Sequence, residues 1–286
     1  MVRRNNMRLE TAPPVAYEYG ILSPAVTVVY ETSDDWLDGF EYETIDGVIE
    51  VTNQALTRGT GADQEVVIPR GDGTRYRTYY PFNVQASIES STAGTTPEEQ
   101  ETHLRNATKV AIQKAVEAEF WKGTIAKTLD EADGNRYLSR AEATDVTPVA
   151  NTAVKVKYGL ALLEQALGNA TIGSAGVIHA PILIATNLGA SDKDGALTTT
   201  LGNKVVAGAG YSNIGPDGTV APTGSAWMYA TGPVTVRLAQ EPKLVPTPGV
   251  NHRSNTIEYF LDTPAAVTWS TTNLYTVLVD LELDYA

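Results

Sequence analysis

The most constraining feature of this sequence is one long helix with a complete start signal, set between two β-rich stretches. Thr96, Pro97 and Glu99 combine an N-cap residue, a proline at the first helical position and the glutamate of a capping box. The pattern predicts a helix from this cap to about Trp121, with Gly123 as its stop. About 25 residues rising about 1.5 Å each make a rod of roughly 37 Å. We expect such a rod to pack along a β-sheet, which indicates an α+β fold.

One side of the predicted helix is lined by small residues. Leu104 begins this side and four alanines continue it, namely Ala107, Ala111, Ala115 and Ala118, with Val110, Ile112, Val116 and Phe120 beside them. We expect the small-residue side to allow a close approach between the helix and its sheet.

The chain before the helix begins with an arm. Residues 1–35 contain Pro13, Pro14 and Pro24, which disfavour a helix. The segment predicts only one short strand, at 26–30. An arm of this kind is either frayed or docked on a partner.

A long β-hairpin is expected next, within residues 36–90. Two β-rich runs, 40–46 and 76–88, are separated by a polar tip and by the turn signal at 71–74. An isolated hairpin is at best marginally stable in water, so it needs a surface to lie on, such as a neighbouring subunit. The arginines of this stretch are candidates for contacts between subunits: Arg58, Arg70, Arg75 and Arg77.

The chain after the long helix predicts a second helix and then mostly strands. A helix is expected at 154–167, a short strand at 177–180 and a short helix at 182–188. Further strands are expected at 204–207, 226–230, 234–237, 255–261 and 273–285. The last of these alternates apolar with polar residues, so we expect one buried face and one solvated face that carries three acids.

Charge and cysteine content exclude several classes of protein. The 286 residues include no cysteine, which removes disulfides, zinc-thiolate sites and cysteine nucleophiles. The net charge of −13 makes a general nucleic-acid binder a poor candidate, because such proteins need a basic stripe. No apolar run approaches the roughly 18 residues of a membrane span, and the basic start is not followed by the apolar region of a signal peptide.

No catalytic or cofactor constellation is recognisable. The three histidines, His103, His179 and His252, lie far apart and lack partners at metal-ligand spacing. His179 is in an apolar strand, which favours a satisfied core residue over a general base. The glycines of 208–215 have the wrong spacing for a dinucleotide fingerprint, and the sequence 192–195 departs from a calcium loop. We expect no enzyme, no cofactor and no metal.

Trp227 and Tyr229 are further candidates for contacts between subunits, because large aromatic side chains are enriched at interfaces. A place in the protein's own core is an equally good interpretation of these two residues.

Several sequence strings, in this order, resemble the major capsid proteins of tailed actinobacteriophages, which have the Hong Kong 97-type fold. They are Tyr-Pro-Phe-Asn-Val at 80–84, the capped helix ending Glu-Phe-Trp-Lys-Gly at 119–123, Val-Ile-His-Ala-Pro at 177–181, the glycine-rich 201–211, and Trp-Met-Tyr-Ala-Thr-Gly-Pro-Val at 227–234. No single string is diagnostic, but their order and spacing are fairly specific.

The resemblance implies a division of the chain into five parts. These are an N-arm (1–35), an extended E-loop hairpin (36–90), a peripheral domain with a spine helix and β-sheet (91–144), an α/β axial domain (145–255) and strands that return to the peripheral domain (256–286).

The resemblance also implies a function. Such proteins form hexamers and pentamers of one chain that close an icosahedral shell around double-stranded DNA, without sequence specificity, in virions assembled in the host bacterial cytoplasm. The partners implied are other copies of the chain, a separate scaffolding protein, a portal and a decoration protein. The candidates for facing DNA are Arg3, Arg4 and Arg8. Residues 40–85 contain no lysine, so we expect no lysine–asparagine cross-link from the hairpin.

Two other functions remain open from the sequence. An encapsulin-type compartment would have the same fold and enclose an enzyme instead of DNA. A β-rich surface-binding module would be a monomer with a ligand pocket.

Overall fold

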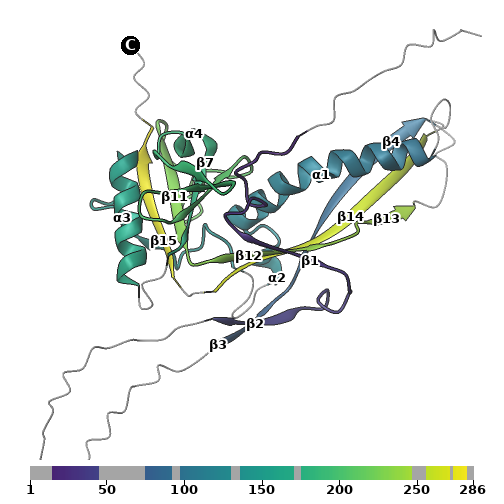
Figure 1. The fold of residues 1–286 in the computed structure, drawn as a ribbon, viewed down its shortest axis with the longest axis horizontal. Helices are drawn as coiled ribbons and strands as arrows, with labels where there is room; N and C mark the ends of the chain where they lie inside the picture. Colours follow the sequence, from purple (N-terminus) through teal and green to yellow (C-terminus); the bar gives the residue numbers. More distant parts are fainter. Residues whose placement is uncertain are drawn as a thin grey trace, which may run out of the picture.

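Two β-sheets and one long helix form the frame of the molecule (Figure 1). The structure is a computed structural model, and it describes residues 15–44, 75–91, 97–129, 136–170, 175–246, 256–270 and 273–281. The long helix lies along one sheet, and the other sheet stands at the C-terminal end of that helix (Figure 1).

The predicted long helix is confirmed as α1 (Pro97–Lys122), with Glu98 and Glu99 in its first turn. It ends at Gly123, which has a positive φ of 61° and donates its N–H to the carbonyl of Glu119. The short α2 (Ala126–Leu129) follows.

The buried face of α1 differs from the expected one. Ala107 and Ala111 are exposed, and Ala115 and Ala118 are only partly buried. The buried positions are instead Leu104, Thr108, Ile112, Gln113, Val116, Glu117, Phe120 and Trp121. The helix turns its larger side chains inward because these remove more apolar surface from water than alanine does.

A five-stranded sheet supports α1. Its strands are β1 (Thr27–Glu31), β4 (Phe82–Ser91), β12 (Val234–Ala239), β13 (Lys243–Pro246) and β14 (Thr256–Trp269). β14 pairs antiparallel with β4, β12 and β13, and β1 pairs parallel with β12 at the end of the sheet. Val234, Val236 and Leu238 share a core cluster with Ile112 and Val116 of α1.

The second large sheet has eight strands and is covered by a helix. Its strands are β5 (Thr144–Asp145), β6 (Val154–Lys155), β7 (Val177–Pro181), β8 (Ser191–Lys193), β9 (Ala196–Thr198), β10 (Lys204–Gly208), β11 (Ser225–Thr231) and β15 (Leu274–Asp280). Helix α3 (Val156–Asn169) packs on β15 and β11 through Leu160, Leu163 and Leu167. The predicted helix at 182–188 is shorter, as α4 (Ile182–Ala185).

The sequence 192–195, expected to be a plain loop, is the turn of a β8–β9 hairpin. Asp194 and Gly195 both have positive φ, of 57° and 75°. Two consecutive residues of positive φ are typical of a tight Asp-Gly hairpin turn. The Asp-Gly pair in the sequence is a signal for this turn, but the sequence analysis compared the segment only with a calcium loop.

The prediction of a solvated face on the last strand was wrong for most of β15. Thr276 and Leu278, on the expected polar face, are 0% and 1% exposed. The strand lies inside the sheet, between β11 and the short β5 and β6, and both its faces are covered. Asp280 alone, of the described residues on that face, is exposed, while the remaining acids lie outside the described residues.

Residues 256–286 were expected to return to the domain of the long helix, and their two described strands pair in different sheets. β14 pairs in the five-stranded sheet beside α1, and β15 pairs in the eight-stranded sheet. β12 and β13, from the range expected to form the axial domain, pair beside α1 as well.

The base of the predicted hairpin is confirmed as β2 (Phe40–Thr44) and β3 (Arg75–Tyr79), paired antiparallel from Phe40↔Tyr79 to Thr44↔Arg75. Residues 45–74, which hold the predicted tip, lie outside the described residues. The base packs on the five-stranded sheet, where Trp36 and Tyr79 share a buried cluster with Ala266.

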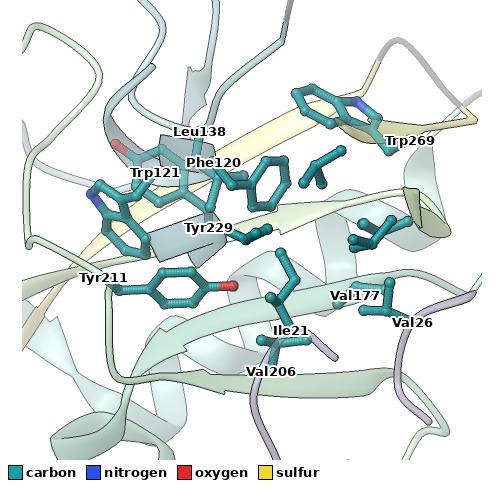
Figure 2. Close-up of a cluster of buried hydrophobic side chains, with 14 of the residues drawn as sticks. Ile21, Val26, Phe120, Trp121, Leu138, Val177, Val206, Tyr211, Tyr229 and Trp269 are labelled. Atoms are coloured by element: carbon teal, nitrogen blue, oxygen red, sulfur yellow. The ribbon is translucent and has the colours of Figure 1, made fainter. Parts of the chain in front are cut away.

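Figure 2 shows the cluster that joins the two sheets. Phe120 and Trp121 of α1 meet Tyr229 of β11 and Trp269 of β14, with Ile21 of the N-terminal segment beneath them. The rings of Trp121 and Tyr229 meet edge to face with centroids 4.9 Å apart, an arrangement that aromatic pairs favour. One end of α1 therefore fixes how the two sheets meet.

Candidate functional site

The described part of the chain contains no group of three or more histidine or acidic side chains placed to hold a metal ion. It also contains no helix that is long and apolar enough to cross a membrane. The search for a functional site therefore turns to buried polar groups, exposed elements and hollows.

His179 is a core residue, as predicted. It is fully buried on β7, with Nδ1 2.9 Å from the hydroxyl of Tyr211 and Nε2 3.0 Å from the hydroxyl of Thr231. Because Thr231 donates its own proton to the carbonyl of Gly232, it accepts one from Nε2, and Nδ1 accepts from Tyr211. Burial lowers the pKa of His179 to about 3, so the ring is neutral and has no access to a substrate.

Glu117 is a buried carboxylate that joins three segments. Its Oε1 accepts the N–H of Ile21 at 3.0 Å, and its Oε2 accepts the N–H of Gly210 at 2.8 Å. Burial raises the pKa of Glu117, because desolvation disfavours the charged form. The sequence gives no distinct signal for this residue, which stands among the polar positions of a long helix. Its contacts fasten the N-terminal segment and the loop after β10 to α1.

Trp227 and Tyr229, proposed from the sequence as contacts between subunits, are 7% and 0% exposed. Both belong to the central core cluster, and the Tyr229 hydroxyl donates to the carbonyl of Ile214 at 2.9 Å. The structure supports the alternative interpretation, in which both side chains are part of the protein's own core.

The candidate arginines lie mostly beyond the described residues. Arg75 and Arg77 are on β3, opposite Thr44 and Tyr42. The other candidates are not placed: Arg58, Arg70, Arg3, Arg4 and Arg8.

Arg237 links the five-stranded sheet to the hairpin base. The Arg237 guanidinium on β12 forms an ion pair with Glu31 of β1. Its central carbon also lies 4.9 Å from the centre of the Phe40 ring on β2, within the range of a cation–π contact. The base of the hairpin is thus joined to the five-stranded sheet through Phe40.

Two hollows flank the bulge at 240–242 that separates β12 from β13. One, of about 630 Å³, is bounded by α1, the bulge and Tyr30 of β1. The other, of about 860 Å³, is polar and is bounded by the bulge and residues 31–34. Sequence reasoning missed both, because each forms where segments distant in the chain meet.

Solved structures identify this arrangement of two sheets, long helix and hairpin as the Hong Kong 97-type α+β fold. No family model matches the sequence, and no curated protein matches it either.

Three of the similar structures show the range of the likeness. The SrpI encapsulin from Synechococcus elongatus PCC 7942 has a TM-score of 0.58 at 10% identity, covering 98% of this chain and 95% of that one. The capsid of an empty GTA particle has a TM-score of 0.60 at 15% identity, covering 97% and 95%. Gordonia phage Cozz has a TM-score of 0.55 at 13% identity, covering 96% and 91%. At such identities the likeness establishes the fold, and it confirms the resemblance drawn from the sequence strings.

Proposed function

We propose that this chain is the subunit of a closed protein shell, namely a major capsid protein that forms hexamers and pentamers around phage double-stranded DNA. The observation that carries the proposal is the likeness of its fold, over nearly its full length, to phage and GTA capsids. The order of the sequence strings from 80–84 to 227–234 favours a phage capsid over other shells of this fold.

The parts of the chain take the roles that the resemblance implies. Residues 1–35 are the N-arm, 36–90 the E-loop region and α1 the spine helix of the peripheral domain. The two-sheet division supports an axial domain built on the eight-stranded sheet. It favours assigning β12, β13 and β14 to the peripheral domain and β15 to the axial domain.

Arginines carry two of the contacts that we propose. Arg58, Arg70, Arg75 and Arg77 of the hairpin pair with acids of a neighbouring subunit, and Arg3, Arg4 and Arg8 of the arm face DNA. Replacing the four hairpin arginines with alanine should lower the yield and the stability of shells. Unchanged yield and stability would contradict the pairing.

The hairpin forms no covalent cross-link in this proposal, because residues 40–85 contain no lysine. Denaturing gels of assembled shells should show no covalently linked band whose link maps to this segment. A covalent ladder whose links map to this segment would contradict the prediction.

The remaining partners follow from the same proposal. A separate scaffolding protein, a portal and a decoration protein would act with the shell, which is assembled in the host cytoplasm and ends as the virion.

An encapsulin compartment is the second candidate, and the likeness to the SrpI encapsulin favours it. Neighbouring genes for packaging motors would support the capsid, and an enclosed enzyme would support the encapsulin.

The first experiment is negative-stain electron microscopy of the expressed chain, alone and together with the products of neighbouring genes. Closed shells, or rings with fivefold and sixfold symmetry, are the expected result. A monodisperse monomer under every condition would overturn the shell proposal and favour a surface-binding module.

A further inference from the structure

The N-terminal segment passes from solvent into the core within a few residues. Val15 and Tyr17 are 86% and 59% exposed. Ile21, only four residues after Tyr17, is fully buried in the central core cluster. The stretch 17–21 is therefore the place where this segment leaves the body of the molecule, and the contacts that hold the stretch decide the direction in which it leaves.

Two polar side chains of α1 hold this stretch by its main chain. The amide of Gln113 donates from Nε2 to the carbonyl of Tyr17 at 3.0 Å. One turn further along the helix, Oε1 of Glu117 accepts the N–H of Ile21 at 3.0 Å. Gln113 and Glu117 are buried, at 5% and 0% exposed, and hydrogen bonds are stronger in such surroundings than in water. These two residues are here called the arm latch.

The two bonds of the arm latch also give the stretch a direction. Tyr17 and Ile21 are four residues apart, and their partners on α1 are four residues apart in the same order. The stretch therefore runs beside α1 in the direction of the helix, toward its C-terminal end, and the first dark purple part of the ribbon in Figure 1 follows this course. Followed backwards from Ile21 to Tyr17, the chain heads for the N-terminal end of α1.

The eight-stranded sheet holds the same stretch through Tyr19. Ala207 of β10 donates its N–H to the carbonyl of Tyr19 at 2.8 Å, and the hydroxyl of Tyr19 donates to Asp192 of β8 at 2.9 Å. Tyr17 and Ile21 thus bond to α1, while Tyr19 between them bonds to the sheet. A stretch attached to two elements at three positions cannot swing about a single point, so its direction is fixed.

Gly20 allows the chain to approach the arm latch closely. A Cβ at this position would lie 1.8 Å from Nε2 of Gln113 and 2.6 Å from Oε1 of Glu117. A side chain at this position would therefore push the Gln113 amide away from the carbonyl of Tyr17. The bonds of the latch depend on this glycine as well as on α1.

We propose that Gln113 and Glu117 are positioning residues for the arm, which direct residues 1–14 along α1 toward its N-terminal end. Every copy of the chain then presents its arm in the same direction. In the proposed shell, a common direction lets the arms of neighbouring copies reach equivalent partners, as closed symmetry requires. This role in assembly rests on the proposed function, whereas the direction of the arm within one copy does not.

Distances between two spin labels test the direction in the unassembled full chain, which has no cysteine of its own. One label is attached to the arm through Thr11→Cys. The other is attached to α1 through Ala107→Cys or Lys122→Cys, two exposed positions about 22 Å apart. Labelled chain is diluted with unlabelled chain, so that the distances measured by pulsed electron paramagnetic resonance lie within one copy.

The expected result is an unequal pair of distances. Thr11 lies six residues before Tyr17 and extends at most about 20 Å from it. Tyr17 is bonded to α1 at a point between the two labelled positions, so an arm without a fixed direction gives nearly equal mean distances. A directed arm should give a mean distance at least about 10 Å shorter to Ala107 than to Lys122.

Loss of the arm latch should remove this difference. Gln113→Leu removes the donor to the carbonyl of Tyr17, and Glu117→Gln leaves one acceptor oxygen for the N–H groups of Ile21 and Gly210. In each variant the two mean distances should agree within about 5 Å.

A control with the same kind of substitution is available on α3. Gln165→Leu changes an exposed glutamine of that helix and should keep the difference between the two distances. Circular dichroism shows which variants keep the fold. Equal distances with the latch intact, or an unchanged difference in folded latch variants, would overturn the assignment. The comparison with the latch intact needs no latch variant, so it decides the direction even where a variant fails to fold.

The outcomes separate the positioning of the arm from the shell proposal. Shells in electron micrographs, formed by a chain whose arm shows no preferred direction, would overturn the positioning alone. A directed arm on a chain that forms no shell under any condition would overturn the shell proposal and leave the positioning in place.

Discussion

His179 illustrates how a single residue couples stability to pH. The folded chain holds its ring neutral to about pH 3, whereas the unfolded chain takes up a proton below about pH 6.5. The full contribution is present above pH 6.5, and the free energy of unfolding should then fall by about 1.4 kcal/mol for each pH unit between these values. Urea unfolding at several pH values measures this slope.

The variant His179→Gln isolates the effect, because glutamine keeps a donor and an acceptor but does not titrate. The slope should decrease in this variant and remain in His103→Gln, where the exposed His103 is changed instead. Glu117 has the opposite effect on the pH dependence of the free energy of unfolding, because burial raises its pKa. Its contribution to stability is present at low pH and is lost as the pH rises. Its contribution is common to all three proteins and cancels. Equal slopes for wild type and His179→Gln would refute the assignment.

Gly210 is required by close packing. A Cβ at this position would lie 2.2 Å from the backbone carbonyl oxygen of Lys114 and 2.8 Å from the amide nitrogen of Ala118. Neither atom can move without distorting α1, so Gly210→Ala should destabilise the protein by about 2 kcal/mol or more.

Gly168 supplies the matched control within helix α3. A Cβ there meets nothing within 4 Å, so Gly168→Ala should stabilise the helix by up to about 1 kcal/mol. Thermal unfolding of the two variants and the wild type should show a lower melting temperature for Gly210→Ala and a higher one for Gly168→Ala. A melting temperature lowered equally in both would contradict the packing argument.

At the scale of elements, the base of the hairpin depends on a small apolar anchor. Trp36 is 6% exposed and packs with Tyr79 and Ala266. Trp36→Ala should speed amide hydrogen exchange in β2 and β3 and leave β11 and β15 unchanged, because the two regions share no core cluster. The surface variant Val149→Ala should change neither. Unaltered exchange in β2 and β3 would show that the strands are held by other contacts.

Elements with strong local signals were predictable from sequence, and elements defined by distant partners were not. The capping box at Thr96–Glu99 located α1 because its information is local. Which side of α1 is buried depends on the sheet beneath it, so the stripe of alanines predicted the wrong buried face. β15 looked half-solvated because its alternation gives no sign that α3 and the central core cover both faces. The sequence could not decide whether Trp227 and Tyr229 are buried, and it could not locate the hollow of about 630 Å³ beside α1. The reason is the same, because the surroundings of each come from remote segments.

At the scale of the whole molecule, net charge opposes the proposed assembly. Each copy carries −13, so copies repel one another at long range. Raising monovalent salt from about 10 mM to about 150 mM shortens the screening length from about 30 Å to about 8 Å. The short apolar contacts between copies are not weakened by this change. Shell yield, followed by light scattering and electron microscopy, should therefore rise with salt across this range.

The same salt titration distinguishes the effect of net repulsion between copies from the effect of specific ion pairs. Pairs between hairpin arginines and neighbouring acids would weaken as salt increases, which lowers the yield instead. Circular dichroism of the unassembled chain at both salt concentrations controls for a change in the fold itself. A yield that falls steadily with salt, on an unchanged fold, would mean that a few arginine pairs outweigh a charge of −13 per copy. The variant with four alanines in place of those arginines would then lose that dependence, which assigns the effect to the hairpin.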